Sequence, residues 1–254
     1  MLFTDASISS VDDLGGYESE VKEVAAIAGL DLSTKLGLAQ TEIGVELLAA
    51  NTPLAAGYTQ RAAFDLGQVV VTDALRLWHI FHALAIVYRD AYNRKLNDKY
   101  LLKWNEYRAL AKWAANLYFN IGMGLVYRPL PAPGLPSLSS APGGAMVETI
   151  YFIRVTWTDG QGAESAPSPV VSYAVPAGEL LSISLVSLEV PPGVTGWFPY
   201  VGTAADQEQR QAASPLDPAA AWTMPETGLV AGPLRPQGQA ADVFRKVARS
   251  LQRG

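Results

Sequence analysis

Hydrophobic residues recur at helical spacing through the first half of the chain. Residues 11–30 favour a helix with acidic residues in its first turns, where the partial positive charge of a helix N-terminus attracts them. Asp31 is suited to cap a second helix that runs to about Ala50. This second helix has an apolar face with residues every three or four positions, namely Leu32, Leu36, Ala39, Ile43 and Leu47.

Two longer helices are predicted further along. The first begins at Thr72 or Asp73, after a VVV run that fits either a short strand or an extended lead-in. The second covers about residues 97–121 and is ended by Gly122 and Gly124. Its tryptophans, Trp104 and Trp113, have a spacing typical of core positions.

The stretch LRLWHIFHALAIVYRDAYNRKLNDKY, residues 75–100, opens with a segment that is apolar on almost every side. Such a helix is buried on most sides. A small bundle seldom covers one of its helices completely, so we expect part of this helix, around Trp78 and Phe81, to meet another copy of the chain. His79 and His82 are then hydrogen-bonded at that seam.

The second half changes to an alternating pattern. In VETIYFIRVTWTD, residues 147–159, Ile150, Phe152, Val155 and Trp157 form the apolar side with one phase slip, and DGQG predicts a tight turn. Pro199 favours an edge strand or a bulge for GWFPYVGTA. Further strands are expected at residues 170–175, 179–190, 196–204 and 221–224. Six or seven short strands in about ninety residues indicate a β-sandwich.

The tryptophans of this half, Trp157, Trp197 and Trp222, are predicted to lie in the core of that sandwich. An aromatic platform that binds sugars is the alternative interpretation of the same residues.

The prolines divide the chain into domains. Only Pro53 precedes Pro129, although the chain has 17 prolines. The segment RPLPAPGLPSLSSAPGG, residues 128–144, therefore reads as a linker. We predict an α+β multidomain protein with a helical bundle at 1–127, this linker, a β-sandwich of immunoglobulin or fibronectin-III type at 145–236, and a C-terminal arm at 237–254 that forms a short helix.

Composition restricts the function classes. The 254 residues are 49% hydrophobic and 17% charged, which is enough apolar material for packed cores. The formal net charge of −5 disfavours a chain that binds nucleic acid or anionic membranes over its whole surface. No cysteine is present, so disulfides and thiolate chemistry are excluded. The N-terminus has no signal-peptide pattern, and the longest apolar run is too short to span a bilayer.

His79 and His82 are the only histidines, and they lie three residues apart. On a helix they share one side and could hold a metal ion together. A catalytic zinc site needs a third ligand, however, and no glutamate follows the first histidine. We therefore predict that they are not metal ligands, that the chain is not an enzyme, and that it uses no cofactor. A metal-dependent enzyme remains the alternative.

Charge is split along the helical half. Residues 1–88 carry eleven acidic and four basic side chains, whereas residues 89–112 carry seven basic and three acidic ones. Opposite charges on one domain would let identical copies attract each other head to tail. Arg94 and Lys95 are the candidate contacts in this basic block. Solvated helix faces with local pairs, such as Lys99 and Lys103 near Glu106, and contact with DNA are the two other interpretations.

The C-terminal segment, residues 239–254, has apolar residues every four positions and four basic side chains. This pattern predicts a short amphipathic helix that is ordered against a partner. The candidate docking residues are Val243, Phe244, Arg245, Val247, Arg249 and Leu251.

The segments DLSTKLGLAQTEIGVELLAA and LRLWHIFHALAIVYRDAYNRKLNDKYLLKWNEYRALAKWA, the latter residues 75–114, combine short helices with two long ones rich in Trp, Tyr and Arg. Through these segments the helical half resembles the head-to-tail adaptor proteins of tailed bacteriophages. The β half resembles fibronectin-III or immunoglobulin-like modules of virion proteins, through TWTDGQGAESAPSP and YVGTA. Minimal adaptors lack such a module.

The resemblance implies a structural virion protein at the head–tail junction, assembled in the host cytoplasm. Such adaptors form rings of about twelve copies between the portal and the tail or neck proteins, and DNA passes through the lumen without sequence recognition. Their C-terminal segment docks onto the portal. The alternative is a multimeric virion protein that binds a receptor or glycan through its β-sandwich.

Overall fold

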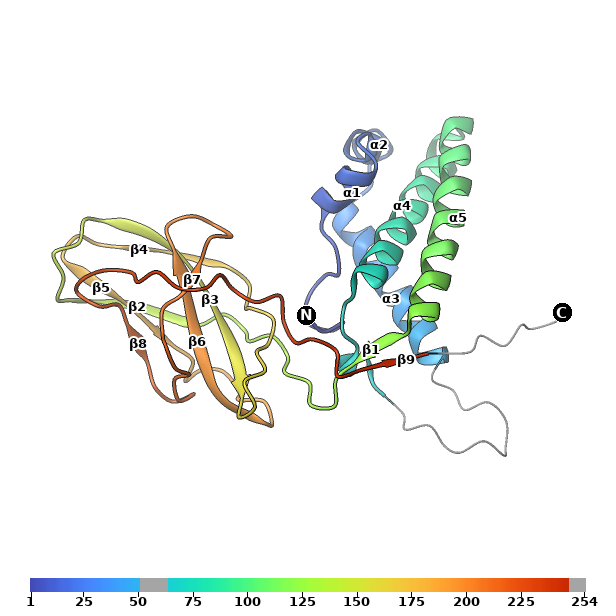
Figure 1. The fold of residues 1–254 in the computed structure, drawn as a ribbon. Coiled ribbons are helices and arrows are strands. Elements are labelled where there is room, and N and C mark those ends of the chain that lie inside the picture. Colours follow the sequence, from blue (N-terminus) through green and yellow to red (C-terminus); the bar gives the residue numbers. More distant parts are fainter. Residues whose placement is uncertain (51–63, 247–254) are drawn as a thin grey trace, which may run out of the picture. The chain divides into compact units, whose positions relative to one another are not determined.

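The structure is a computed structural model that describes residues 1–50 and 64–246. It is an α+β protein in which the helices lie mostly in the N-terminal half and antiparallel sheets in the C-terminal half (Figure 1). The chain forms two compact units. The helical unit begins at Ala6, continues to Tyr127 and resumes at Ala241, whereas the β unit combines Met1–Asp5 with Arg128–Ala240. Each unit is therefore assembled from segments that are far apart in sequence.

Five α-helices make up most of the described helical unit (Figure 1). Both predicted long helices are present, and α3 has the predicted bounds and apolar face. Their bounds are Val11–Tyr17 for α1, Val21–Ala28 for α2, Leu32–Ala50 for α3, Asp73–Lys95 for α4 and Asp98–Ile121 for α5. A short 3₁₀ turn, η1, covers Leu66–Gln68.

Side-chain caps fix where the long helices begin. The Asp31 carboxylate accepts a hydrogen bond from the Ser33 amide at 3.0 Å at the start of α3. Thr72 accepts from the Leu75 amide at 3.3 Å, and Asn97 accepts from the Lys99 amide at 2.9 Å. Each cap satisfies an amide that has no partner within its helix. At the other end of α5, Gly122 adopts φ 112°, as the predicted helix end requires.

Residues 11–30 form two helices in place of the one predicted, because Glu18 turns inward between them. Its carboxylate accepts a 2.6 Å hydrogen bond from the Tyr107 hydroxyl and pairs with Lys103 at 2.9 Å. Burial alone would raise the pKa of Glu18, but these two partners outweigh it and hold that pKa below its ordinary value. Long-range partners thus decide the break between α1 and α2.

Helix α4 lies at the centre of this unit, since α1, α2, α3 and α5 each pack on it. Trp78, Leu84 and Tyr88 of α4 are almost completely buried. The two long helices α4 and α5 lie side by side (Figure 1). The apolar character of α4 on nearly every side is therefore accounted for within one copy of the chain.

A small antiparallel sheet completes the helical unit. Strand β1, Met123–Leu125, pairs with β9, Val243–Arg245, and Leu125 also forms a bridge with Val69. The VVV run is therefore the extended lead-in to α4. The predicted C-terminal helix is wrong over its described part, because residues 243–245 are a strand. The free edge of β1 offers main-chain partners, which a helix of this length cannot match in water.

The β unit has a three-stranded and a four-stranded antiparallel sheet (Figure 1). The strand orders are β2-β5-β8 and β4-β3-β6-β7. The bounds are Ser137–Pro142 for β2, Thr149–Asp159 for β3, Val171–Val175 for β4, Glu179–Ser184 for β5, Val194–Gly202 for β6, Gln209–Arg210 for β7 and Trp222–Thr223 for β8. One hydrophobic core contains residues from both sheets, including Trp157 of β3, Ile183 of β5 and Trp197 of β6.

The structure corrects the predicted core face of β3 and the predicted extent of the linker. In β3 the core face is Tyr151, Ile153, Val155 and Trp157 without a phase slip, while Ile150 is exposed. Part of the predicted linker is strand β2, which pairs with β5 along its whole length. As an edge strand it tolerates Pro142.

Pro199 does not mark an edge, because β6 lies between β3 and β7. Its carbonyl accepts from the Gln211 amide at 2.9 Å, so its nitrogen also faces the side of β7. Strand β7 covers only Gln209–Arg210, so the ladder ends there and needs no amide from Pro199.

Candidate functional site

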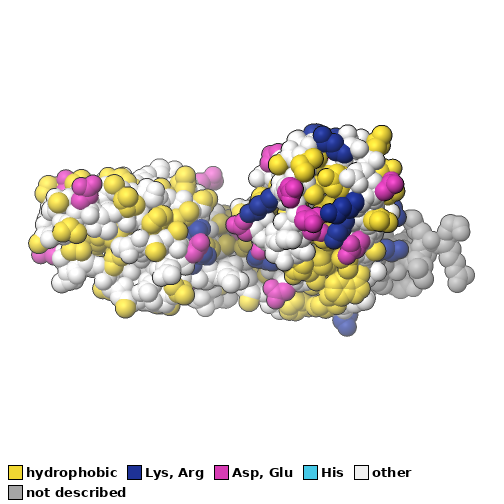
Figure 2. Space-filling model, turned by 90° about the horizontal axis from the view of Figure 1, so that it is seen from above, with side chains coloured by type: hydrophobic (Ala, Val, Ile, Leu, Met, Phe, Trp, Pro, Cys, Tyr) yellow, Lys and Arg dark blue, Asp and Glu magenta, His cyan; other side chains and the backbone are white. Residues whose placement is uncertain are grey.

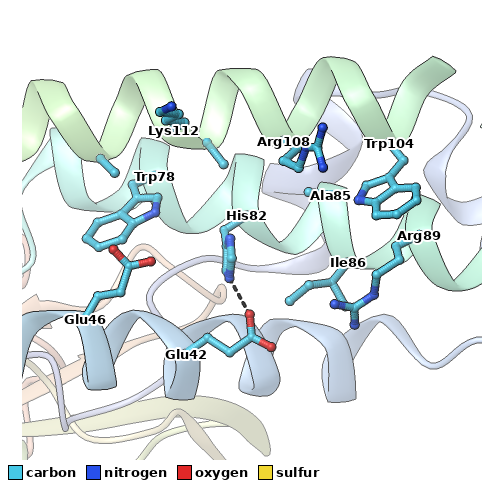
Figure 3. A pocket seen from close by; sticks show the side chains of 12 residues that line it. Glu42, Glu46, Trp78, His82, Ala85, Ile86, Arg89, Trp104, Arg108 and Lys112 are labelled. Carbon is cyan, nitrogen blue, oxygen red and sulfur yellow. Dashed lines mark hydrogen bonds and ion pairs between the residues drawn. The ribbon is translucent and has the colours of Figure 1, made fainter. Parts of the chain in front are cut away.

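A groove of about 310 Å³ crosses the helical unit between α3 and α5, with α4 beneath it. Its floor is apolar and includes the indole of Trp78 and the small side chains Ala85, Ala111 and Ala115. Trp104 lies at its far end from Trp78 in the close-up (Figure 3). Helix packing explains the groove, because α3 and α5 both rest on α4 and small residues on α4 and α5 leave space between them.

The walls of the groove carry opposite charges. Glu42 and Glu46 come from α3, whereas Arg108 and Lys112 come from α5 (Figure 3). The Arg108 guanidinium lies 5.8 Å from the centre of the Trp104 ring, within range of a cation–π contact. Acidic and basic walls over an aromatic floor suit noncovalent binding of a segment that carries apolar and charged side chains.

His82 faces this groove from α4. Its Nε2 lies 2.6 Å from the Glu42 carboxylate, and both side chains are partly exposed. This pair joins α4 to α3 at the open side of the bundle (Figure 3). The predicted hydrogen bond of His82 is present, but its partner belongs to the same chain.

His79 lies about one helical turn before His82 on α4, is buried and has a structural role. Its Nε2 lies 3.0 Å from the Leu36 carbonyl, which can only accept, so Nε2 carries the proton. Its Nδ1 then accepts from the Ser9 hydroxyl at 2.6 Å. Burial lowers the pKa of His79 to about 4, so the ring is neutral at pH 7. Both nitrogens are used to join α4 to α3 and to the segment before α1.

Trp78 and Phe81 are also buried within their own unit. Trp78 packs against Tyr118 and Phe119, and Phe81 packs against Tyr17 and Tyr107. Their apolar surface is already covered, with exposed fractions of 2% and 8%. The apolar pattern of α4 therefore gives no reason to expect that Trp78 and Phe81 contact a neighbouring copy. Four helices of the same chain cover α4, where we expected fewer.

Arg94 and Lys95 are adjacent in the sequence but have different surroundings in the structure. The Arg94 guanidinium donates to the carbonyls of Ala28 and Gly29, both at 2.8 Å, and so caps the C-terminus of α2. Lys95 is exposed at the end of α4. Among the six predicted interface residues, Arg94 and Lys95 are exposed and His82 is partly exposed, whereas Trp78, His79 and Phe81 are buried.

Much of the basic block pairs with acidic residues of the same chain. Lys99 pairs with Glu20 at 2.8 Å, and Lys103 pairs with Glu18 at 2.9 Å and Glu106 at 3.6 Å. The local pairs that the sequence suggested are thus partly present, since Lys103 contacts Glu106. Arg108 and Lys112 remain exposed at the groove.

The predicted docking residues of the C-terminal segment are only partly described. Val243, Phe244 and Arg245 form β9, in which Phe244 is about half exposed. Val247, Arg249 and Leu251 lie outside the residues that the structure describes.

The tryptophans of the β unit form its core. Trp157, Trp197 and Trp222 are buried, as predicted, and so offer no aromatic platform at the surface. On the α5 helix the prediction fails for Trp113, which is 53% exposed, and Trp104 lines the groove.

Sequence reasoning missed the residues of the groove walls. Glu42, Glu46, Arg108 and Lys112 read as ordinary polar positions on amphipathic helices. One signal was visible, because Trp104 and Trp113 cannot both point toward the same core from positions nine residues apart.

Neither a metal site nor a membrane span is found among the described residues. Within 1–50 and 64–246, no three His, Asp, Glu or Cys side chains come together as metal ligands would. The helices described here also lack the combination of length and apolar character that a bilayer crossing requires. Comparisons with protein-family models, curated proteins and solved structures gave no match.

Proposed function

We propose that this chain is a structural virion protein that forms a ring at the head–tail junction of a tailed phage, between portal and tail, with DNA passing through the lumen. The observation that carries the proposal is the groove between α3 and α5, whose acidic and basic walls suit protein–protein contact. The resemblance of residues 75–114 to phage adaptors supports the same interpretation. The chain acts by binding and assembly in this proposal, without catalysis.

We also propose that the β unit is a fibronectin-III or immunoglobulin-like module. Two antiparallel sheets of three and four strands around a tryptophan-rich core support this assignment. Such a module is an addition to the helical adaptor and lies on the outside of the ring in this proposal.

The C-terminal segment is proposed to contact the portal. Its first part is fixed to the helical unit, because β9 pairs with β1 and the Asp242 carboxylate accepts from the Tyr127 amide at 2.8 Å. This anchor presents Phe244 at the surface beside the basic residues that follow. Partners of the assembled ring are then the portal on one side and tail or neck proteins on the other.

Measurement of the native mass tests the proposal. A closed ring of about twelve copies is expected. The ring should weaken when salt rises, because the Debye length falls from ~10 Å at 0.1 M to ~3 Å at 1 M. A trimer would favour the receptor- or glycan-binding alternative. A monomer at all concentrations would remove the ring proposal, and a monomer with stoichiometric zinc would favour a metal-dependent enzyme.

A further inference from the structure

The groove between α3 and α5 is lined by residues inside three long helices, and this limits what can fill it. Within a helix each amide donates to the carbonyl four residues earlier, so the walls offer no main-chain partners. An extended segment on the apolar floor would bury its own amides and carbonyls without partners, which is costly. A helix pairs these groups internally. A segment that fills the groove is therefore expected to be helical.

The floor of the groove has room for about three turns of such a helix. It follows α4 from Trp78 to Arg89, eleven residues further on, which is about 16 Å at 1.5 Å per residue. The small side chains of Ala85, Ala111 and Ala115 allow the main chain of another helix to approach closely. Apolar side chains at positions i, i+3, i+4 and i+7 of that helix would contact this floor.

Each wall of the groove carries two like charges one helical turn apart. These are Glu42 and Glu46 on α3, and Arg108 and Lys112 on α5. Like charges at this spacing slightly destabilise the helix that carries them, so helix stability does not explain the arrangement. Figure 3 shows the two pairs in the same order along the groove, with Glu46 and Lys112 toward one end and Glu42 and Arg108 toward the other.

The ion pairs of the described residues leave the groove open. Glu42 pairs with His82 of the floor at 2.6 Å, and its own side chain remains 41% exposed. Arg108 lies beside the ring of Trp104, and both Arg108 and Lys112 are exposed. Within the described part of the chain, no ion pair joins the α3 wall to the α5 wall. Charge of both signs therefore remains accessible to an occupant.

A second copy of this chain offers no matching helix among its described elements. Helices α1 and α2 have seven and eight residues, fewer than three turns, and α4 is covered by its neighbours. On α3 the edge opposite the glutamates carries Gly37 and Gln40. On α5 the edge opposite the basic wall carries Lys99 and Lys103. Neither α3 nor α5 combines an acidic edge with a basic one, so the occupant is expected to be a different protein.

We propose that the groove binds an amphipathic helix of a partner protein, with one acidic and one basic edge. Carboxylates four residues apart on its acidic edge face Arg108 and Lys112, and its basic edge faces Glu42 and Glu46. Its apolar face lies on the floor between the two walls. This inference rests on the proposed role of the groove in protein–protein contact, and it adds the shape and the chemistry of the partner.

Two synthetic peptides test this chemistry. Both are about twenty residues long, so that a helix can form, and they share an apolar face of leucine and alanine. The two-edged peptide has glutamates on one edge and lysines on the other, whereas the reference peptide has glutamines at these positions. In fluorescence anisotropy the native chain should bind the two-edged peptide at least about tenfold more tightly. Equal affinities, or no binding of either peptide, would overturn the proposal.

Charge reversal of one wall should change which peptide is preferred. The double variant Arg108→Glu, Lys112→Glu has two acidic walls, so its affinity for the two-edged peptide should fall at least about tenfold. It should gain affinity for a third peptide with lysines on both edges, a gain that unfolding cannot produce. If circular dichroism shows the double variant unfolded, the two single variants replace it.

The control for this reversal is Lys95→Glu. Lys95 is exposed at the end of α4 and does not line the groove, so the affinity for the two-edged peptide should stay unchanged. An equal loss in Lys95→Glu and in the double variant, or no loss in the double variant, would contradict contact with the α5 wall.

The native mass of the chain without peptide separates this inference from the ring. A ring that binds no two-edged peptide overturns this inference alone. A monomer that binds the peptide overturns the ring and supports the partner helix. If the double variant of the α5 wall has a lower native mass than the native chain, a second copy occupies the groove and the proposed partner is wrong.

Discussion

The helical and β units use their charged side chains differently. In the helical unit many ion pairs lie at the surface, such as Lys22 with Asp12 and Lys99 with Glu20. In the β unit Glu208 is fully buried and pairs with Arg154 and Arg235. Figure 2 shows charged side chains of both signs over the helical unit and fewer over the β unit. Charge is thus available to partners on the first unit and engaged in internal contacts on the second.

Polar side chains of the β unit mostly serve its own backbone. Ser165 accepts from the Trp157 amide at 2.9 Å, and Ser168 accepts from the Val155 amide at 3.1 Å. The Asp159 carboxylate accepts from the amide of Gln161, inside the DGQG turn, and from the amide of Ala163, just after it. These bonds hold the segment after β3 along that strand, where strand pairing would otherwise be missing. The comparison teaches that binding capacity is concentrated on the helices.

The largest loss of stability is expected when the hydrophobic core of the β unit is disrupted. Trp197 is completely buried, and its Nε1 donates to the Asp217 carbonyl at 3.0 Å. Trp197→Ala should lower the free energy of unfolding of the β unit by about 3–5 kcal/mol. Urea unfolding followed by near-ultraviolet circular dichroism measures this loss. Trp113→Ala, on the exposed side of α5, should change stability by less than ~0.5 kcal/mol. Loss of the helical signal in Trp197→Ala would contradict separate cores.

The second largest loss of stability is expected at Glu208, the buried carboxylate of the β unit. Glu208→Gln removes the buried carboxylate that Arg154 and Arg235 share and leaves them only the exposed carboxylate of Asp206, so we expect a loss of about 3 kcal/mol. The matched change in the helical unit, Glu20→Gln, removes an exposed partner of Lys99 and should have no measurable effect. Chemical unfolding of both variants compares them directly. Similar stabilities would show that the two units do not differ in this way.

His79 makes the stability of the helical unit depend on pH. Its folded pKa of about 4 lies below the ordinary value of 6.5, so the unfolded chain binds the proton first as pH falls. The free energy of unfolding of the helical unit should be highest above pH 6.5 and decrease toward pH 4. At 1.36 kcal/mol per pH unit, the loss should reach about 2 kcal/mol by pH 5. Unfolding of the native chain and of His79→Gln at pH 7.5 and pH 5 tests this. A dependence that is equally steep in His79→Gln would rule out His79 as its cause.

The smallest expected effect distinguishes two neighbouring residues. Arg94→Ala removes two hydrogen bonds to the end of α2 and should cost about 1 kcal/mol. Lys95→Ala should leave the stability of the monomer unchanged, because Lys95 is exposed at the end of α4. Thermal unfolding of the two variants shows the difference. Equal melting temperatures would mean that Arg94 does not hold α2 in place.

The local sequence pattern alone was sufficient to predict where the long helices begin and end. The cap at Asp31, the helix starts near Thr72 and Asn97 and the helix end at Gly122 are properties of a few neighbouring residues, and they lie where the sequence placed them. The apolar face of α3 was correct for the same reason, because spacing of 3.6 residues fixes which side chains share a side. The tight turn at DGQG also follows from local chemistry.

The candidate site was much harder to predict from sequence. Glu42 on α3, His82 on α4 and Arg108 on α5 come together only because α3 and α5 both pack on α4. The sequence correctly favoured a hydrogen-bonded His82, but it could not name Glu42, forty residues away. The neutral state of His79 likewise depends on its burial in the tertiary structure, where Leu36 and Ser9 are its hydrogen-bond partners.

By itself, the sequence determined that helices precede strands, where the long helices begin and end, and that the tryptophans of the second half are core. Tertiary structure alone decided three things: that Trp78 and Phe81 are covered within one copy, that Tyr151 and Ile153 face the core of the β unit, and that Val243–Arg245 is a strand. The physical reason is the range of the interactions. Spacing and caps depend on residues within one or two helical turns, whereas β9 depends on an edge offered by β1, more than a hundred residues earlier in the chain.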